Sequence, residues 1–358
     1  MENLQLSATE EPHKKPVGWL WFIIYALAVQ VVVFLGIYFW FWSYADAVGP
    51  LAAGQKAEVI IPPGSSLDRI QELLDEKKII IPDSRFGLLA RKTGVDQRLR
   101  AGEYLFCGPV TPRQVLKKLA DGEVILHPVT IPEGVNIYQI ADILATNSRF
   151  DRQRFLDLVT DQEFIKKTGL AGKSLEGWLF PDTYHFIRSQ DEEDVIKMMT
   201  DRFRKIYDEL LAGLAEPPAM TEKQVVTLAS IVEKETGVAA ERPLIAAVFL
   251  NRLQKGMYLQ ADPTVIYGLK KFNGNLTKKD LRDPTPYNTY RRKGLPAGPI
   301  CNPGRESLAA VLHPADANYL YFVSRNDGSH YFSKTLTEHN RAVYRFQKSK
   351  TGRQRTDR

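Results

Sequence analysis

The pattern of hydrophobic residues separates one long apolar segment near the start of the chain from a mixed remainder. Every residue from Val17 to Trp42 is apolar, aromatic or glycine except Gln30. At about 1.5 Å per residue, a helix of about 26 residues crosses a hydrocarbon core of about 30 Å. Residues 17–42 therefore predict a transmembrane helix, and the tryptophans at its two ends suit the membrane interfaces.

Charged residues on either side of this segment predict its orientation. Lys14 and Lys15 precede it, whereas Asp46 follows it. Positively charged flanks stay on the cytoplasmic side, so residues 1–16 are expected to form a cytoplasmic arm. Everything after Ser43 is then expected on the periplasmic or extracytoplasmic side of the cell (inner) membrane, after a single pass.

A cleavable signal peptide is the alternative interpretation of the apolar segment. Ala45 and Ala47 form a small-x-small pattern of the kind found at cleavage sites. The apolar core of a signal peptide spans only about 7 to 15 residues, however, and this segment is far longer. A permanent anchor is therefore favoured, followed by a linker of small residues, Gly and Pro at residues 43–56.

After the linker, short β-branched runs alternate with amphipathic helical runs, which predicts an α+β fold. The run EVIIPP from Glu58 predicts a strand, and Ser66 is placed to cap the helix that follows. We expect a small α+β domain at residues 57–127, a larger α+β domain at residues 128–346 and a basic tail at residues 347–358.

A weak internal repeat joins these two regions. IPPGSSLDRIQELL from Ile61 and IPEGVNIYQIADIL from Ile131 align without a gap. Both copies read as a strand, a Pro/Gly turn and an amphipathic helix. The same local structure is therefore expected at both places.

The stretch LASIVEKET reads as part of a helix, because it continues an apolar run without Gly or Pro. At about 100° per residue, Glu235 falls between Leu228 and Ile231 at the edge of the apolar face, while Glu233 projects near the opposite edge. A carboxyl group in a partly apolar place holds a proton near neutral pH, as a general acid requires. Both glutamates are also explained as boundary residues that pair with nearby basic side chains, and the helical geometry alone leaves both interpretations open.

Two further segments combine groups that suit a sugar cleft. EGWLFPDTYHF places Glu176 and Tyr184 around a Pro-Asp turn, among aromatic rings that can stack on pyranose rings. Residues 259–290 carry polar and aromatic side chains on turn-forming backbone: Gln260, Asp262, Thr264, Tyr267, Tyr287, Asn288 and Tyr290. Each of these is also explained as a core residue, a turn former or a satisfied surface group, so a substrate groove is one of two interpretations.

Composition narrows the classes of function. A net charge of +6 permits nucleic-acid binding, but part of the excess lies in the two tails, so no nucleic-acid partner is expected. The two cysteines, Cys107 and Cys301, are too few for a metal cluster, and we favour two unpaired core thiols over one long-range disulfide. His313, His330 and His339 lack the spacing of a helical zinc motif, so no metal and no cofactor is expected.

Several long motifs carry a resemblance to a known family. They are the segment around Glu176, VFLNRLQKGMYLQADPTVIYGL from Val248, PYNTYRRKGLPAGPICNPGRESLAAVLHP from Pro286 and YLYFVSRNDGSHYFSKTLTEHN from Tyr319. Together with the ASIVEKET helix they closely resemble the endolytic murein transglycosylases, the YceG-like family, over nearly the whole chain. The resemblance implies that the catalytic acid is Glu235, the residue that the helical pattern also selects.

The resemblance also implies a domain organisation and a reaction. Residues 57–127 would form a LysM-like glycan-binding domain, and residues 128–346 a catalytic transglycosylase domain. The implied lyase reaction breaks the β-1,4 bond between N-acetylmuramic acid and N-acetylglucosamine in peptidoglycan and leaves 1,6-anhydro ends. The muramyl 6-hydroxyl attacks in place of water, so Glu235 alone can donate and then accept the proton. The expected partners are peptidoglycan glycan strands and, functionally, the peptidoglycan synthases.

Two alternatives of other kinds stay open. A hydrolytic muramidase would use Glu235 with a second acid such as Glu233 or Asp262. A membrane-anchored scaffold would bind peptidoglycan without cutting it, and residues 57–127 would be a spacer if they bind nothing. Anhydro ends, reducing ends or the absence of cleavage distinguish these three functions.

Overall fold

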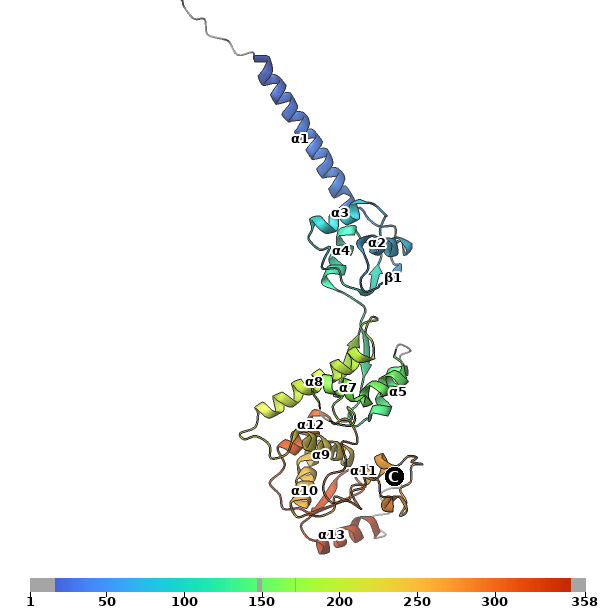
Figure 1. Ribbon diagram of the computed structural model, residues 1–358, viewed down its shortest axis with the longest axis vertical. Helices are drawn as coiled ribbons and strands as arrows, with labels where there is room; N and C mark the ends of the chain where they lie inside the picture. Colours follow the sequence, from blue (N-terminus) through green and yellow to red (C-terminus); the bar gives the residue numbers. More distant parts are fainter. Residues whose placement is uncertain (1–16, 147–149, 171, 349–358) are drawn as a thin grey trace, which may run out of the picture. The chain divides into compact units, whose positions relative to one another are not determined.

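The structure, a computed structural model, describes residues 17–146, 150–170 and 172–348. The expected cytoplasmic arm at residues 1–16, most of the basic tail, and residues 147–149 and 171 of the larger expected domain lie outside this part. The chain divides into two compact units, Met1–Ile125 and Leu126–Arg358, and each is described here by itself (Figure 1).

The first unit begins with helix α1, Val17–Ala45. Its span Trp19–Ala45 is long and apolar enough to cross a membrane, and most of its large side chains are exposed. The helix runs three residues past the predicted end at Trp42. Its last two residues, Tyr44 and Ala45, are 3% and 0% exposed in the core of this unit.

The rest of the first unit is a two-stranded antiparallel sheet with three helices. Lys56 at the start of β1 pairs with Cys107 at the end of β2. In chain order the elements are β1 Lys56–Ile61, α2 Leu67–Glu76, α3 Arg85–Lys92, β2 Gly102–Cys107 and α4 Pro112–Asp121. The predicted cap at Ser66 is confirmed, because its side chain accepts a hydrogen bond from the N–H of Arg69 at the start of α2.

Two features of this unit differ from the expectations drawn from the sequence. The segment 43–56 is not a free linker, because Tyr44, Ala45 and Leu51 are buried in the core. Cys107 is exposed, so of the two unpaired thiols only Cys301 lies in a core. Small residues in a sequence do not distinguish a flexible linker from a segment that packs closely, because both use them.

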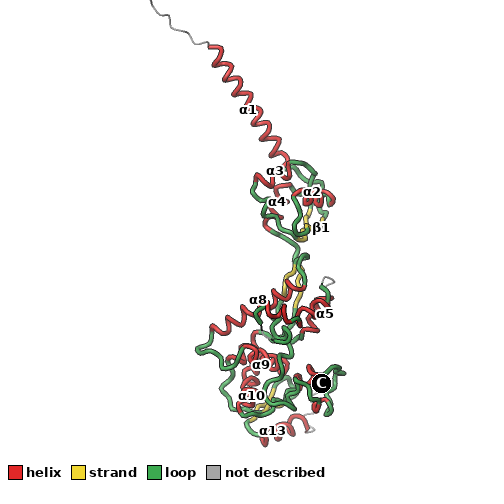
Figure 2. The backbone as a smooth tube through the Cα atoms, viewed as in Figure 1, coloured by secondary structure: helices red, strands yellow, loops and turns green. Residues whose placement is uncertain are grey.

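The second unit is mainly helical, with two short two-stranded sheets (Figure 2). β3 pairs with β4, and β5 pairs with β6, both antiparallel. Its helices and strands are β3 His127–Thr130, α5 Ile137–Thr146, α6 Arg152–Thr160, α7 Gln162–Lys167, β4 Thr183–Phe186, α8 Glu192–Ala212, α9 Glu222–Glu235, α10 Arg242–Gln254, α11 Asp262–Gly268, α12 Arg305–Leu312, β5 Tyr321–Ser324, β6 His330–Ser333 and α13 Leu336–Val343.

The two copies of the sequence repeat adopt the same local structure. β1 leads through a turn into α2, and β3 leads through a turn into α5. The turn glycines at equivalent positions, Gly64 and Gly134, have φ angles of 76° and 75°. Only glycine adopts this backbone conformation without strain, so the repeat in the sequence reflects a repeated turn.

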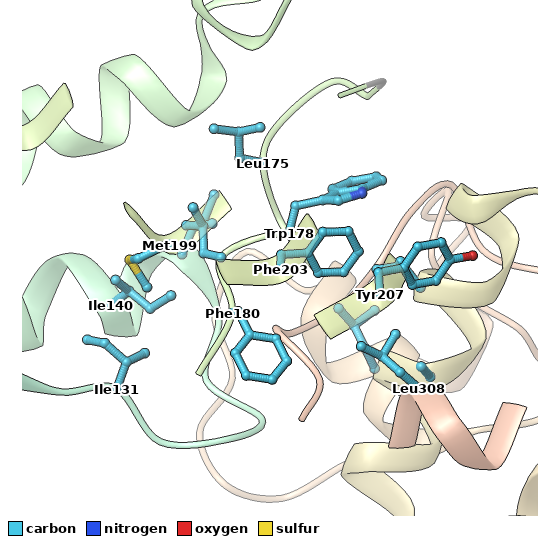
Figure 3. Packing of buried hydrophobic residues seen from close by; sticks show 14 of the residues in the cluster. Ile131, Ile140, Leu175, Trp178, Phe180, Met199, Phe203, Tyr207 and Leu308 are labelled. Atoms are coloured by element: carbon cyan, nitrogen blue, oxygen red, sulfur yellow. The ribbon is translucent and has the colours of Figure 1, made fainter. Parts of the chain in front are cut away.

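Helix α9 lies in the middle of the second unit and packs on α10, α11 and α12. Thr221 and Gln224 form a capping box at its start. All residues from Val225 to Val232 are buried, as in a helix surrounded by protein. Its neighbours include the aromatic core shown in Figure 3, where the rings of Phe203 and Tyr207 stack at 5.5 Å. Burial of α9 up to Val232 therefore holds its C-terminal end, where Glu235 stands, in the core.

Candidate active site

Glu235 is the last residue of α9 and lines a cavity of about 300 Å³. The other side chains that line this cavity come from α10, α13, strand β5 and the loop and helix around α11: Arg252, Leu259, Gln260, Asp262, Tyr290, Phe322 and His339. Most of them are polar and some are aromatic, which is the combination that binds sugar hydroxyls and sugar faces.

The environment of Glu235 makes its carboxyl group a proton donor near neutral pH. Burial, the larger cause, and the nearby Asp262 carboxylate together raise its pKa to about 7, against the opposing effect of the Arg252 guanidinium. The side chain is only half-buried, so a substrate in the cavity can reach it. A carboxyl group with this pKa can both give and take a proton at physiological pH.

Asp262 stands at the first turn of α11 and is held by a neighbour. The hydroxyl of Tyr290 donates a hydrogen bond to Asp262 Oδ1 at 2.6 Å. Burial, together with this bond, raises the pKa of Tyr290, so its hydroxyl stays protonated and continues to donate. The pair places one negative charge and one aromatic ring beside Glu235.

The turn that carries Gln260 and Asp262 is braced from behind. Gln260 has a φ angle of 52°, which is unusual for a residue other than glycine. The Thr264 hydroxyl donates to the carbonyl of Ala261 at 2.7 Å, and the Thr289 hydroxyl accepts from the N–H of Ala261 at 3.0 Å. Thr264 was expected in the groove, but its side chain is fully buried and supports the cavity wall.

Arg252 connects the cavity to the rest of the unit. Its guanidinium donates to the carbonyl of Leu320 and to that of Leu259, both at 2.7 Å. It also lies over the ring of Tyr321, 5.3 Å from the centroid. The side chain is 8% exposed and lines the cavity, where its positive charge lowers the pKa of Glu235.

Three residues of the cavity were not expected there from the sequence: Arg252, Phe322 and His339. His339 stacks on Tyr321 at 5.2 Å, and its Nδ1 atom is buried without a hydrogen-bond partner among the described residues. All three residues fall within the long motifs VFLNRLQ, YLYFVS and TLTEHN. The motifs indicated the segments that carry these residues, but they do not show which side chains line the same cavity.

Glu233 lies outside the cavity. Its side chain is 6% exposed and pairs with Arg242 Nη2 at 3.3 Å. The N–H of Gly304 donates to its other oxygen at 2.9 Å. This carboxylate joins the end of α9 to α10 and to the loop before α12. Its contacts are those of a structural residue.

Glu176 is buried in a network of its own. It accepts hydrogen bonds from the N–H of Ile137, the hydroxyl of Tyr267 and the amide of Asn302. Burial raises its pKa to about 8, and these three bonds oppose the shift. Tyr184 is also buried and donates to the carbonyl of Phe180 at 2.6 Å. Neither side chain lines the cavity with Glu235.

The remaining groove candidates support the loop that carries Tyr290. Asn288 is fully buried, and its amide donates to the carbonyls of Leu281 and Asp283. Its Oδ1 accepts from the N–H of Tyr290 at 2.9 Å. The ring of Tyr287 packs edge-on against Tyr267 at 4.8 Å. The structure therefore brings Glu235, Gln260, Asp262 and Tyr290 together and leaves the other candidates outside the cavity.

Comparison with known proteins points to one family. The sequence model described as the YceG-like family matches residues 59–345. A relative from Bacillus subtilis (strain 168), named endolytic murein transglycosylase, is 33% identical over 306 residues, which is 81% of this chain and 84% of the relative. A relative of the same name from Streptococcus pneumoniae (strain R6) is 28% identical over 356 residues, covering 90% of this chain and 64% of the relative.

A solved structure is similar as well. The crystal structure of a YceG-like protein from Listeria monocytogenes matches with a TM-score of 0.55 and 36% sequence identity. The match covers 80% of this chain and 98% of that one. The mixed helix-and-sheet fold expected from the sequence is thereby confirmed.

Proposed function

The chain belongs to the YceG-like family, and from that membership we propose that it is an endolytic peptidoglycan lytic transglycosylase, a lyase, with Glu235 as its catalytic acid. The observation that carries this proposal is the half-buried Glu235 carboxyl, with a pKa of about 7, in a polar and aromatic cavity. The relatives named endolytic murein transglycosylase support the substrate class.

The proposed reaction needs one carboxyl group in two successive roles. Protonated Glu235 gives its proton to the glycosidic oxygen as the bond from N-acetylmuramic acid to N-acetylglucosamine breaks. The muramyl 6-hydroxyl then forms a bond to the anomeric carbon, and the Glu235 carboxylate takes its proton. The proton count is restored, no water is consumed, and the nucleophile has a high effective concentration because it belongs to the same sugar.

The other cavity residues have supporting roles in this proposal. The Asp262 carboxylate favours the protonated form of Glu235 and stabilises positive charge that develops at the anomeric carbon. Gln260 offers an amide to sugar hydroxyls, and Phe322 offers an apolar face. Thr264 and Asn288 brace the cavity wall. Glu176, Glu233, Tyr184 and Tyr287 lie outside the cavity, so we assign them structural roles rather than contacts with the sugar.

Product analysis tests the reaction type. Mass spectrometry of purified peptidoglycan digested by the full chain is expected to find 1,6-anhydro ends, which are lighter than reducing ends by one water. Reducing ends would instead show hydrolysis, with Asp262 as the second acid beside Glu235. Hydrolysis is the main alternative because both carboxyl groups line the same cavity. If the glycan strands stayed intact, the protein would be a glycan-binding scaffold that does not cut them.

We place the chain in the cell (inner) membrane, crossing it once through α1, with its N-terminus in the cytoplasm. The apolar span Trp19–Ala45 supports a membrane helix, and the preceding Lys14 and Lys15 support the orientation. Alkaline phosphatase fused after Arg358 is expected to be active, because it needs disulfides that form outside the cytoplasm. A fusion reporter that works only in the cytoplasm would refute both this orientation and the peptidoglycan substrate.

The two units are assigned different tasks. The order β1–α2–α3–β2 supports a LysM-like, glycan-binding role for the small domain predicted at residues 57–127, and the cavity supports catalysis by the domain at 128–346. Sedimentation with purified peptidoglycan tests the first assignment in an inactive Glu235→Gln background. Deleting residues 57–125 is expected to reduce sedimentation, and an unchanged amount would make this domain a spacer.

The anchor suggests the biological setting. A membrane-bound enzyme meets glycan strands while the peptidoglycan synthases still extend them, so we assign the synthases as functional partners and strand termination as the role. Replacing residues 1–39 by a cleavable signal peptide keeps Tyr44 and Ala45 in the core. This change is expected to leave purified activity unaltered and to lengthen strands in cells. Normal strand lengths at equal abundance would make the anchor incidental.

A further inference from the structure

The end of α1 is held firmly by the first unit. The Arg85 guanidinium donates to the carbonyl of Trp40 at 2.5 Å and lies 4.6 Å over the Trp40 ring. Arg113 pairs with Asp46 at 2.9 Å and lies 4.7 Å over the ring of Trp42. With Tyr44 buried as well, the helix cannot swivel freely against the unit.

These contacts determine the depth of α3 at the membrane. Trp40 and Trp42 are aromatic residues at one end of the apolar span, where such rings lie at the level of lipid headgroups. Arg85 is the first residue of α3 and reaches back along α1 by more than one helical turn. If α1 crosses a membrane, the start of α3 therefore lies at the headgroup layer.

The surface of the first unit next to this contact is apolar and basic. Val48, Ile81 and Leu88 are large aliphatic residues that are 61%, 49% and 48% exposed. Leu88 follows Arg85 by three residues and so shares its side of α3, and the carbonyl of Ile81 accepts a hydrogen bond from the Tyr44 hydroxyl at 3.0 Å. Val48 follows the end of α1 by three residues.

Two positive charges border this aliphatic surface. Arg91 and Lys92, at the end of α3, are exposed. The nearby acidic groups Asp83 and Asp46 are already paired with Arg85 and Arg113. Beyond Ile81, α2 carries an acidic groove, with Asp68, Glu72 and Asp75 next to Pro82 and Ser84. Arg91 and Lys92 are thus the exposed cations that follow Leu88 on α3.

We propose that Val48, Ile81, Leu88, Arg91 and Lys92 form a membrane-docking collar that inserts its aliphatic side chains among lipid headgroups and binds acidic phospholipids through its two cations. The occupant is a lipid surface because the collar is continuous with the end of α1, which itself meets the bilayer. Exposed aliphatic residues next to basic ones are the pattern of an interfacial anchor. The collar rests on the proposal that α1 spans the membrane, and it goes beyond glycan cleavage.

Fluorescence quenching in lipid nanodiscs tests the collar on the full chain. A bimane label is placed at Leu88→Cys in a Cys107→Ser background, because Cys107 is exposed and Cys301 is buried. Lipids spin-labelled near the carbonyl are expected to quench the label much more strongly than one at Ile60→Cys. Ile60 is a matched control, since it is also aliphatic and 40% exposed but lies on β1, which packs on β2 and α2. Equal, weak quenching at both positions would overturn the collar.

Two further measurements separate the parts of the proposal. A label at Leu35→Cys, within α1, must be quenched by lipids labelled at the bilayer centre. Failure there would overturn the membrane span rather than the collar alone. In nanodiscs that mix phosphatidylglycerol with phosphatidylcholine, the Leu88→Cys label should be quenched more by labelled phosphatidylglycerol. This preference is expected to fall severalfold in Arg91→Glu/Lys92→Glu, and an unchanged preference would overturn acidic-lipid binding.

Discussion

Glu235→Gln is expected to lower kcat for peptidoglycan cleavage by about 10²- to 10⁴-fold, because the amide keeps the shape of the side chain and cannot donate a proton. The rate is measured by chromatography of released fragments over time. The fold should be preserved, because Glu235 is half-buried at the end of α9 and accepts no hydrogen bond from the described residues that an amide would break. A loss of less than about tenfold, or about 1.4 kcal/mol, would show that Glu235 is not the acid.

Glu233→Gln is the matched control on the same helix. It keeps an oxygen that accepts from the N–H of Gly304 but loses the charge that faces Arg242. We expect a smaller fall in kcat and a loss of about 1 to 3 kcal/mol in the free energy of unfolding. If Glu233→Gln lowered kcat more than Glu235→Gln, Glu233 rather than Glu235 would be the catalytic acid.

Cleavage by the wild-type protein is expected to fall about tenfold per pH unit above pH 7, because only protonated Glu235 can start the reaction. Its pKa is raised to about 7 by burial and by Asp262, so the acid form dominates below that pH and disappears above it. The initial rate is followed from pH 5 to pH 9, with circular dichroism as a check on folding at each pH. An activity that declines already above pH 5 would contradict the raised pKa.

Asp262→Asn should move this alkaline limb to lower pH. Without the Asp262 carboxylate, ionised Glu235 meets less repulsion and its pKa falls, although burial, the larger cause, still holds it above the ordinary value. Tyr290→Phe is the control, because it removes the hydrogen bond to Asp262 and keeps the charge. If activity fell at the same alkaline pH in the wild type and in both variants, the Asp262 charge would have no effect on the pKa of Glu235.

Local features of the fold were predictable from local sequence. The cap at Ser66 and the helix after it depend on residues within one turn of each other. The repeated strand-turn-helix at Ile61 and Ile131 depends on a glycine in each turn. The apolar run of α1 and the helical register that puts Glu235 at the edge of an apolar face are of the same kind. Periodicity and capping act over a few residues, so the sequence determines them.

The cavity was only partly predictable. Gln260, Asp262 and Tyr290 were expected there, but Thr264 and Asn288 turned out to be buried braces of the same loop. The local sequence around a polar turn residue is the same whether its side chain faces a substrate or donates a hydrogen bond to a buried carbonyl. Which of these occurs depends on partners elsewhere in the chain, and sequence pattern does not name those partners.

By itself, then, the sequence determined the apolar segment long enough to cross a membrane, the helix that ends at Glu235 and, through long motifs, the family. Only the tertiary structure decided that Arg252 and His339 share a cavity with Glu235. It also decided that Glu233, two residues earlier, is neutralised by Arg242. The reason is physical: a side chain's pKa and role depend on the groups that packing brings within a few ångströms, and those groups come from distant parts of the chain.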